Sequence, residues 1–384
     1  MTGVQTCALP ISRTGSVLRE GLLLGLMLGL AIGGIFLACA EPLLALLGVA
    51  ADRIDDSARV VRAFAIAYPF QLVNVAAAFF LEGVSRPGRV TAVNLSVLPI
   101  NALLAWALSA GHLGLPALGA VGAALATSIA SLLGAIGMVA SVLTLPRARE
   151  RGVLRRDRAA WAAVPRGAWR LAVFGIVPAV ASGLELAGFS VLIALSTQLG
   201  DAPAHGFQIV FSAHNVTFAI ALGLGSAAGV RAGNAVGEGQ PVAAVRRTLI
   251  AVALSVAALG LGAALLALGA ADIVALFPAT AEVHRIAATM LPRWAPFIVF
   301  DGIQVVLVYA LRSLGDQVVA GVNSILAYFV VTGGVGWWLV HAGVGPIALV
   351  WASGAGMLAA AILHGARFAL VSSRLLRRPI LRRS

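Results

Sequence analysis

Two acidic residues, Glu185 and Asp301, lie near the middle of hydrophobic stretches of the chain. The run from 172 to 199 is long enough to cross a bilayer, and Glu185 stands about halfway along it. The run from 294 to 311 holds Asp301 and has an arginine at each end. A charge at a bilayer centre costs about 2.5–3.5 kcal/mol on insertion scales, so such groups usually line a polar pathway or bind an ion. We therefore predict a coupling-ion or substrate site of a transporter; the alternative is a protonated carboxyl satisfied by a neighbouring helix.

The composition supports a membrane setting for both carboxylates. Hydrophobic residues make up 60% of the 384 residues and charged residues 11%, with a mean hydropathy of +0.98. Soluble domains carry roughly 25% charged residues. We therefore predict an all-α fold, a polytopic bundle of membrane helices. A soluble enzyme is excluded, and because no nucleophile–base pair or metal-ligand spacing occurs, we expect neither catalysis nor a bound cofactor.

The net charge of +12 reflects membrane topology rather than nucleic-acid binding. Every basic side chain apart from histidine is arginine, and the arginines crowd into alternate loops, as the positive-inside rule requires. We do not expect a nucleic-acid groove, which typically interleaves repeated basic and aromatic residues along a surface. The expected partners are therefore the lipid bilayer and a small-molecule substrate, with no nucleic acid.

About ten membrane spans are expected when each crossing takes roughly 20 apolar residues. They cover residues 20–48, 60–82, 91–111, 116–143, 170–199, 204–230, 245–271, 288–311, 318–341 and 344–372. The arginine-rich loops follow the second, fourth, sixth and eighth spans and the last one. We therefore expect both termini on the cytoplasmic side of a cell inner membrane.

The longest polar stretch divides the chain into two hydrophobic halves. The expected parts are a segment at 1–12, an N-terminal lobe of four helices at 13–145, a cytoplasmic linker at 146–169, a C-terminal lobe of six helices at 170–373 and a basic cytoplasmic tail at 374–384. We expect the linker to anchor the topology, with some attraction to anionic lipid. The first twelve residues back-translate closely onto a common sequencing-adapter oligonucleotide, so we expect them to be non-native and the natural protein to start further upstream.

An internal repeat relates the two halves. The stretch that starts at Leu81 parallels the stretch that starts at Leu311: each leads from a polar turn into a helix with an asparagine, then through a loop with Gly and Pro into a helix rich in small residues. Internal repeats of this kind are common in secondary transporters. The second half holds two more spans before its copy than the first. We therefore expect two parallel lobes and twelve helices, of which ten are present.

Three stretches carry a resemblance to a known family. They read GLPALGAVGAALATSIAS at 114–131, GLGSAAGVRAGNAVGEGQPVAA at 223–244 and FDGIQVVLVYALRSLGD at 300–316. Over residues 13–373 the chain resembles the MATE family, the multidrug and toxic compound extrusion group of cation-coupled exporters. The ten spans would then correspond to the family's third to twelfth helices. The resemblance implies a monomer that works by alternating access.

The resemblance assigns a role to the intramembrane carboxylates. Glu185 falls where the family has a glutamate in its seventh helix, and Asp301 where many bacterial members have an aspartate in the tenth. This implies a site for the coupling ion, Na⁺ or H⁺. Four polar side chains of nearby spans are supporting candidates: Ser182, Gln208, Asn215 and Gln304. His214 is a weaker candidate, with interhelical hydrogen bonding as the alternative.

The stretch after the sixth span matches the family's cytoplasmic turn after its eighth helix. Its matching residues are Arg231, Gly233, Asn234, Gly237 and Gly239. We predict a tight turn there, part of a cytoplasmic gate. It is not a phosphate-binding loop, since no strand precedes it and no Lys-Ser/Thr follows. The aspartate on which another branch of the family relies would lie in a helix absent here.

These observations predict a cation-coupled antiporter that exports amphipathic, cationic drugs or metabolites. Two alternatives remain open at this point. A lipid-linked saccharide flippase of the same superfamily would need a cavity rich in arginine, and the predicted spans carry almost none. A non-transporting membrane receptor or scaffold would explain neither the internal repeat nor the buried acids.

Overall fold

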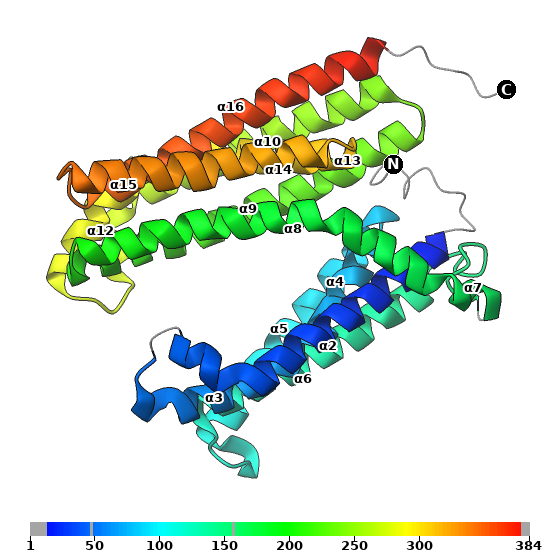
Figure 1. The fold of residues 1–384 in the computed structure, drawn as a ribbon, viewed down its shortest axis with the longest axis horizontal. Coiled ribbons are helices and arrows are strands. Elements are labelled where there is room, and N and C mark those ends of the chain that lie inside the picture. The colour runs from blue at the N-terminus through cyan, green and yellow to red at the C-terminus, as the bar shows by residue number, and fades with distance from the viewer. Residues whose placement is uncertain (1–13, 47–48, 156–157, 378–384) are drawn as a thin grey trace. The chain divides into compact units, whose positions relative to one another are not determined.

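The computed structural model describes residues 14–46, 49–155 and 158–377, without the side chains of 159, 160 and 185. The segment 1–12 and the end of the basic tail, 378–384, therefore lie outside the described residues. Within the described ranges every regular element is a helix (Figure 1). The prediction of an all-α fold is confirmed.

The helices of the N-terminal part run up to the linker. They are α2 (Thr14–Leu46), α3 (Ala51–Ala65), α4 (Ala67–Gly83), α5 (Pro87–Ala110), the short η2 (His112–Gly114), α6 (Gly119–Leu143) and α7 (Arg158–Ala162). The remaining helices are α8 (Val164–Gln198), α9 (Asp201–Gly237), α10 (Pro241–Leu268), α11 (Ala270–Ala275), α12 (Ala281–Trp294), α13 (Phe297–Ser313), α14 (Gln317–Ser324), η3 (Ile325–Thr332), α15 (Gly333–His341) and α16 (Ile347–Arg377). Thus α7 and the first turn of α8 lie within the predicted linker.

Nine helical stretches of the described chain are long and apolar enough to cross a membrane, or ten if one bent pair counts as a span. That pair is α12 and α13, which meet at an angle of 54°. The predicted span 288–311 is therefore not one straight helix. Pro292 lies inside α12 and Pro296 directly precedes α13, and proline disrupts a helix because it removes a hydrogen-bond donor and clashes with the preceding turn.

The described chain forms two compact units, one up to residue 174 and the other from residue 175 onward. In the first unit, Leu18, Leu81 and Met138 join α2, α4 and α6 in one apolar core. Glycines bring α2 and α4 into close contact: a Cβ at Gly29 would lie 2.5 Å from Pro69 Cα. Small residues allow this close approach of membrane helices, where lipid offers no hydrophobic driving force for association.

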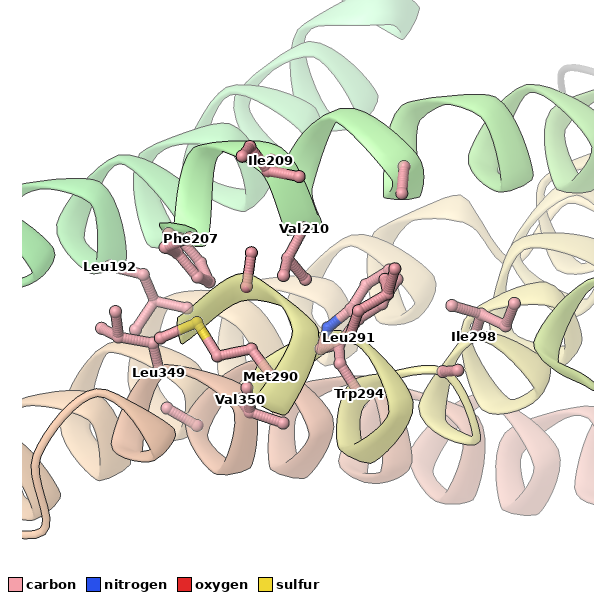
Figure 2. Packing of buried hydrophobic residues seen from close by; sticks show 14 of the residues in the cluster. Leu192, Phe207, Ile209, Val210, Met290, Leu291, Trp294, Ile298, Leu349 and Val350 are labelled. Carbon is pink, nitrogen blue, oxygen red and sulfur yellow. The ribbon is translucent and has the colours of Figure 1, made fainter. Parts of the chain in front are cut away.

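The second unit has its core where α8, α9, α12 and α16 pack together. Figure 2 shows Leu192, Val210, Met290 and Leu349, one from each of these helices, converging on this core. Trp294 at the end of α12 is buried beside them, and its Nε1 donates a hydrogen bond to Ser353 Oγ of α16 at 3.0 Å. This core fixes the bent end of α12 and with it the start of α13, the helix that carries Asp301.

The two copies of the repeat fold into matching helices. The first runs from the end of α4 through α5 and α6, and the second from the end of α13 through α14 and α15 to α16. In the first, Arg89 donates hydrogen bonds to the carbonyls of Ser141 and Thr144 at the end of α6. In the second, Arg367 of α16 forms a bidentate ion pair with Asp316, at 2.5 and 2.7 Å. Each copy thus ties its polar turn to its last helix.

Candidate ion and substrate site

Asp301 of α13 is buried, with 3% of its surface exposed, and the described residues form hydrogen bonds to one of its two carboxyl oxygens. The Tyr328 hydroxyl donates to Oδ1 at 3.0 Å, and Gln304 Nε2 donates to the same atom at 3.1 Å. No described side chain donates to Oδ2. A buried carboxyl needs partners of this kind, because taking an unpaired charge out of water is costly. The arrangement fixes the carboxyl and leaves one oxygen for a ligand.

Tyr328 reaches Asp301 from η3, a stretch of π-helix between α14 and α15. Its side chain is fully buried. Neighbouring helices approach η3 through glycines: a Cβ at Gly188 of α8 would overlap the Tyr328 carbonyl, and a Cβ at Gly356 of α16 would lie 3.0 Å from the Ala327 carbonyl. Single π-turns within α-helices occur frequently at functional sites. The close packing on both sides holds the tyrosine hydroxyl against the carboxyl.

A cavity of about 250 Å³ opens between α8, α9 and α13. Its walls combine aromatic, aliphatic and polar side chains, namely Ser182, Leu186, Phe189, Phe211, His214, Asn215, Phe218, Leu222, Gln304, Val305, Val308, Tyr309 and Arg312. Gln304 belongs both to this wall and to the hydrogen bonds of Asp301. The cavity therefore lies directly beside the buried carboxyl.

His214 stands among the aromatic rings of this cavity. Its ring centroid lies 5.4 Å from that of Phe218 and 5.7 Å from that of Phe189, and Trp294 meets it edge-on at 5.0 Å. His214 is 4% exposed, and its buried Nδ1 has no hydrogen-bond partner among the described residues. The interhelical hydrogen bond expected as the alternative role is therefore not formed by Nδ1. Aromatic contacts hold the ring in place.

The structure brings several of the predicted residues together. Gln304 contacts Asp301, and Ser182 and Asn215 line the same cavity. Glu185 lies in α8 between the cavity residues Ser182 and Phe189, but its side chain lies outside the described part of the chain. Gln208 does not line the cavity, and its side chain is exposed on α9. Its backbone carbonyl accepts a hydrogen bond from the Ser212 hydroxyl, one turn further along the helix.

The predicted tight turn is found at Gly239, whereas Arg231, Gly233, Asn234 and Gly237 precede it in a helix. These residues form the last turns of α9, which ends at Gly237. The turn follows at 238–240, where Gly239 takes the left-handed φ of 72° that glycine adopts without strain. The glycines recur every four residues, so they lie on one helix face, and Gly229 of this series packs on Tyr309.

Sequence reasoning missed Tyr328, Arg312 and most of the aromatic wall as parts of the site. One signal was available for Tyr328, since a hydroxyl inside an apolar span needs a hydrogen-bond partner and the chain has only three tyrosines. Arg312 was placed at the end of its span as a topological charge. In the structure it lines the cavity, with its guanidinium 5.8 Å from the Tyr309 ring centre.

Comparisons with known proteins agree with this architecture. Residues 8–107 and 169–338 match the sequence model of the MatE family. The chain is 32% identical over 344 residues to the probable multidrug resistance protein NorM of Burkholderia pseudomallei, which covers 86% of this chain and 71% of that protein.

Two solved structures show the same fold. The crystal structure of the eukaryotic MATE transporter AtDTX14 has a TM-score of 0.83 and 19% identity, over 97% of this chain and 83% of that one. An outward-facing multidrug resistance MATE family transporter of the MOP superfamily has a TM-score of 0.84 and 18% identity, over 98% and 84%. The match to the family model and the similarity to the NorM relative show that this multi-pass membrane protein belongs to the MATE family.

Proposed function

We propose that this chain is a cation-coupled antiporter that exports amphipathic, cationic drugs or metabolites by alternating access. The observation that carries the proposal is the buried Asp301 carboxyl, bonded on one oxygen and adjoining an aromatic-lined cavity. The name of the NorM relative, a multidrug resistance protein, supports the choice of cargo.

The coupling ion is Na⁺ or H⁺, taken up by Asp301 together with Glu185. Hard cations take oxygen ligands, and Asp301 Oδ2, the Gln304 amide oxygen and the Tyr328 hydroxyl are the oxygens near this carboxyl. A proton would be held by the same carboxyls. To drive export, the cation and the cargo must bind the inward- and outward-facing states with different affinities.

The cavity fits an amphipathic cargo. Phe189, Phe211 and Phe218 offer apolar ring faces, while Asn215 and Gln304 supply hydrogen bonds that orient a ligand. Aromatic faces also attract cations. The flippase alternative gains no support here, since a single arginine lines the cavity. We further propose a monomer in the cell inner membrane with both termini cytoplasmic, on the distribution of arginine.

The test is ethidium efflux from energised cells that express the chain, with and without a Na⁺ pulse. Asp301→Asn and Glu185→Gln should each abolish cation-driven efflux while membrane insertion stays intact. The matched controls are Asp272→Asn and Glu282→Gln, which neutralise exposed carboxylates at helix starts and should leave efflux unchanged. Unchanged efflux in both site variants would overturn the site. No efflux by the inserted parent chain would favour the flippase.

A further inference from the structure

A basic segment, described at 145–155 and 158–170, folds onto the start of α2 in the first unit. Its backbone accepts hydrogen bonds from α2: Gly15 N donates to the Arg151 carbonyl at 2.8 Å, and Arg19 Nη1 donates to the Gly152 carbonyl at 2.8 Å. Val153 joins Leu18 in the apolar core of this unit. The basic segment is therefore a fixed surface of the protein and not a loose tether.

The basic segment lies at the level where membrane spans end. The first span, α2, begins beside it, α6 ends at Leu143 and α8 begins at Val164. In Figure 1, α7 lies next to the start of α2, and the Arg19 guanidinium of α2 stands 5.8 Å from the Trp161 ring centre of α7. With 35 residues, α8 is about 50 Å long, against about 30 Å of hydrocarbon. Its first turns can therefore reach the headgroup region.

The outer face of the basic segment combines arginines with large apolar side chains. The exposed arginines are Arg147, Arg149, Arg155, Arg158, Arg166 and Arg170. The side chains of Trp161 and Trp169 are 53% and 71% exposed, and Leu154 of the same segment is exposed as well. Tryptophan beside basic residues is typical of surfaces that lie in the membrane interface, where the ring enters the headgroup layer and the charges meet anionic lipid.

The basic segment carries more positive than negative charge. The sequence holds eight arginines and two acidic residues between 145 and 170. The ion pair that the described part of the segment shows is the exposed contact of Arg147 with Glu150, at 3.8 Å. The Glu20 carboxylate of α2 is attracted by the charges of Arg170 and Arg19, but it forms no ion pair with either among the described residues. The surface therefore has a surplus of charge to offer an external anion.

We propose that the basic segment docks the headgroups of anionic phospholipids in the leaflet that it faces. Charge complementarity identifies the headgroup phosphate as the anion, and the exposed Trp161 and Trp169 favour a lipid over a soluble acidic partner. The docking would hold the start of α8 at the membrane surface. This proposal is independent of the proposed export function.

The experiment uses the purified, delipidated full chain and measures lipid binding by native mass spectrometry. The probes are phosphatidylglycerol, phosphatidylcholine and inorganic phosphate. R158Q/R166Q removes two exposed charges of the basic segment, and R53Q/R59Q removes two exposed charges of α3 as a matched control. At about 1 kcal/mol per arginine, R158Q/R166Q should weaken phosphatidylglycerol binding about 30-fold, while the control changes it little.

Two further readouts keep the result clear. Melting without lipid should be the same for both double variants, since all four side chains are exposed. Trp169→Ala should weaken binding of both lipids, because the ring enters the interface of either. The proposal is overturned if the two double variants lose phosphatidylglycerol equally, or if phosphatidylcholine or inorganic phosphate binds the parent chain as tightly.

Discussion

The hydrogen bond between Tyr328 and Asp301 offers the sharpest test of the site geometry. Tyr328→Phe removes the hydroxyl that donates to Oδ1 at 3.0 Å and leaves that oxygen with Gln304 alone. The change adds no atoms to a fully buried position and keeps the ring in its packing. The variant therefore removes the hydroxyl whose hydrogen bond to Asp301 joins α13 to η3, and the double-mutant cycle isolates that pair.

The size of the loss depends on the charge of the carboxyl. A hydrogen bond to a charged group contributes about 1.5–3 kcal/mol to stability. Neutral hydrogen bonds between membrane helices average about 0.6 kcal/mol in double-mutant cycles. We therefore expect a coupling energy between Tyr328 and Asp301 of about 0.6–3 kcal/mol, the range that these two kinds of hydrogen bond cover.

The assay is a double-mutant cycle with Tyr328→Phe, Asp301→Asn and the double variant, with the free energy of unfolding measured by denaturant titration in micelles. The control cycle pairs Asp301→Asn with Tyr68→Phe, which removes a hydroxyl from the other unit, where the ring stacks on Phe36. Independent sites add within about 0.3–0.5 kcal/mol. A Tyr328–Asp301 coupling within that scatter would refute the geometry described here.

Three further predictions concern packing and the ion pair. Gly302→Ala should lower the free energy of unfolding by about 1–3 kcal/mol, because its Cβ would lie 2.5 Å from a serine oxygen of α10. The control Gly260→Ala has no neighbour within 4 Å of its Cβ and should not destabilise the protein. Equal melting temperatures of the two variants would contradict this prediction. Gly29→Ala should cost a similar amount through its contact with α4, and a normal melting curve would show that α2 and α4 are further apart. Arg367→Gln should cost about 1–2 kcal/mol, since the pair with Asp316 is bidentate but partly exposed, and Arg367→Lys should restore less than half of it in the same titration.

The membrane spans and one part of the site follow from local rules. Hydropathy marks each span because the bilayer requires about 20 apolar residues. The contact of Gln304 with Asp301 follows from their spacing, since residues three apart lie on one helix face. The contact between these two side chains can therefore be predicted from the sequence, because both lie on a single helix.

The remaining features depend on contacts between helices. The pairing of Tyr328 with Asp301 joins residues 27 apart and depends on a π-turn, for which the apolar sequence of the span has no marker. The predicted turn starts after Gly237 and not at Gly233, because glycine serves both turns and close helix contacts, and the four-residue spacing indicates the latter. The bend before α13 was missed because its two prolines stand within a continuous apolar pattern.

The π-turn of η3 makes the site sensitive to chain length. Its hydrogen bonds join residues five apart instead of four, so α14 and α15 are out of phase, as if one residue had been inserted between them. Removing a residue from 325–332 would allow one continuous α-helix, with one flank turned by about 100° relative to the other. The face that now presents the tyrosine hydroxyl would rotate away from α13 even though every side chain needed for the contact was still encoded. In an aligned sequence, a one-residue gap at this place would therefore predict the loss of the contact between the tyrosine hydroxyl and Asp301.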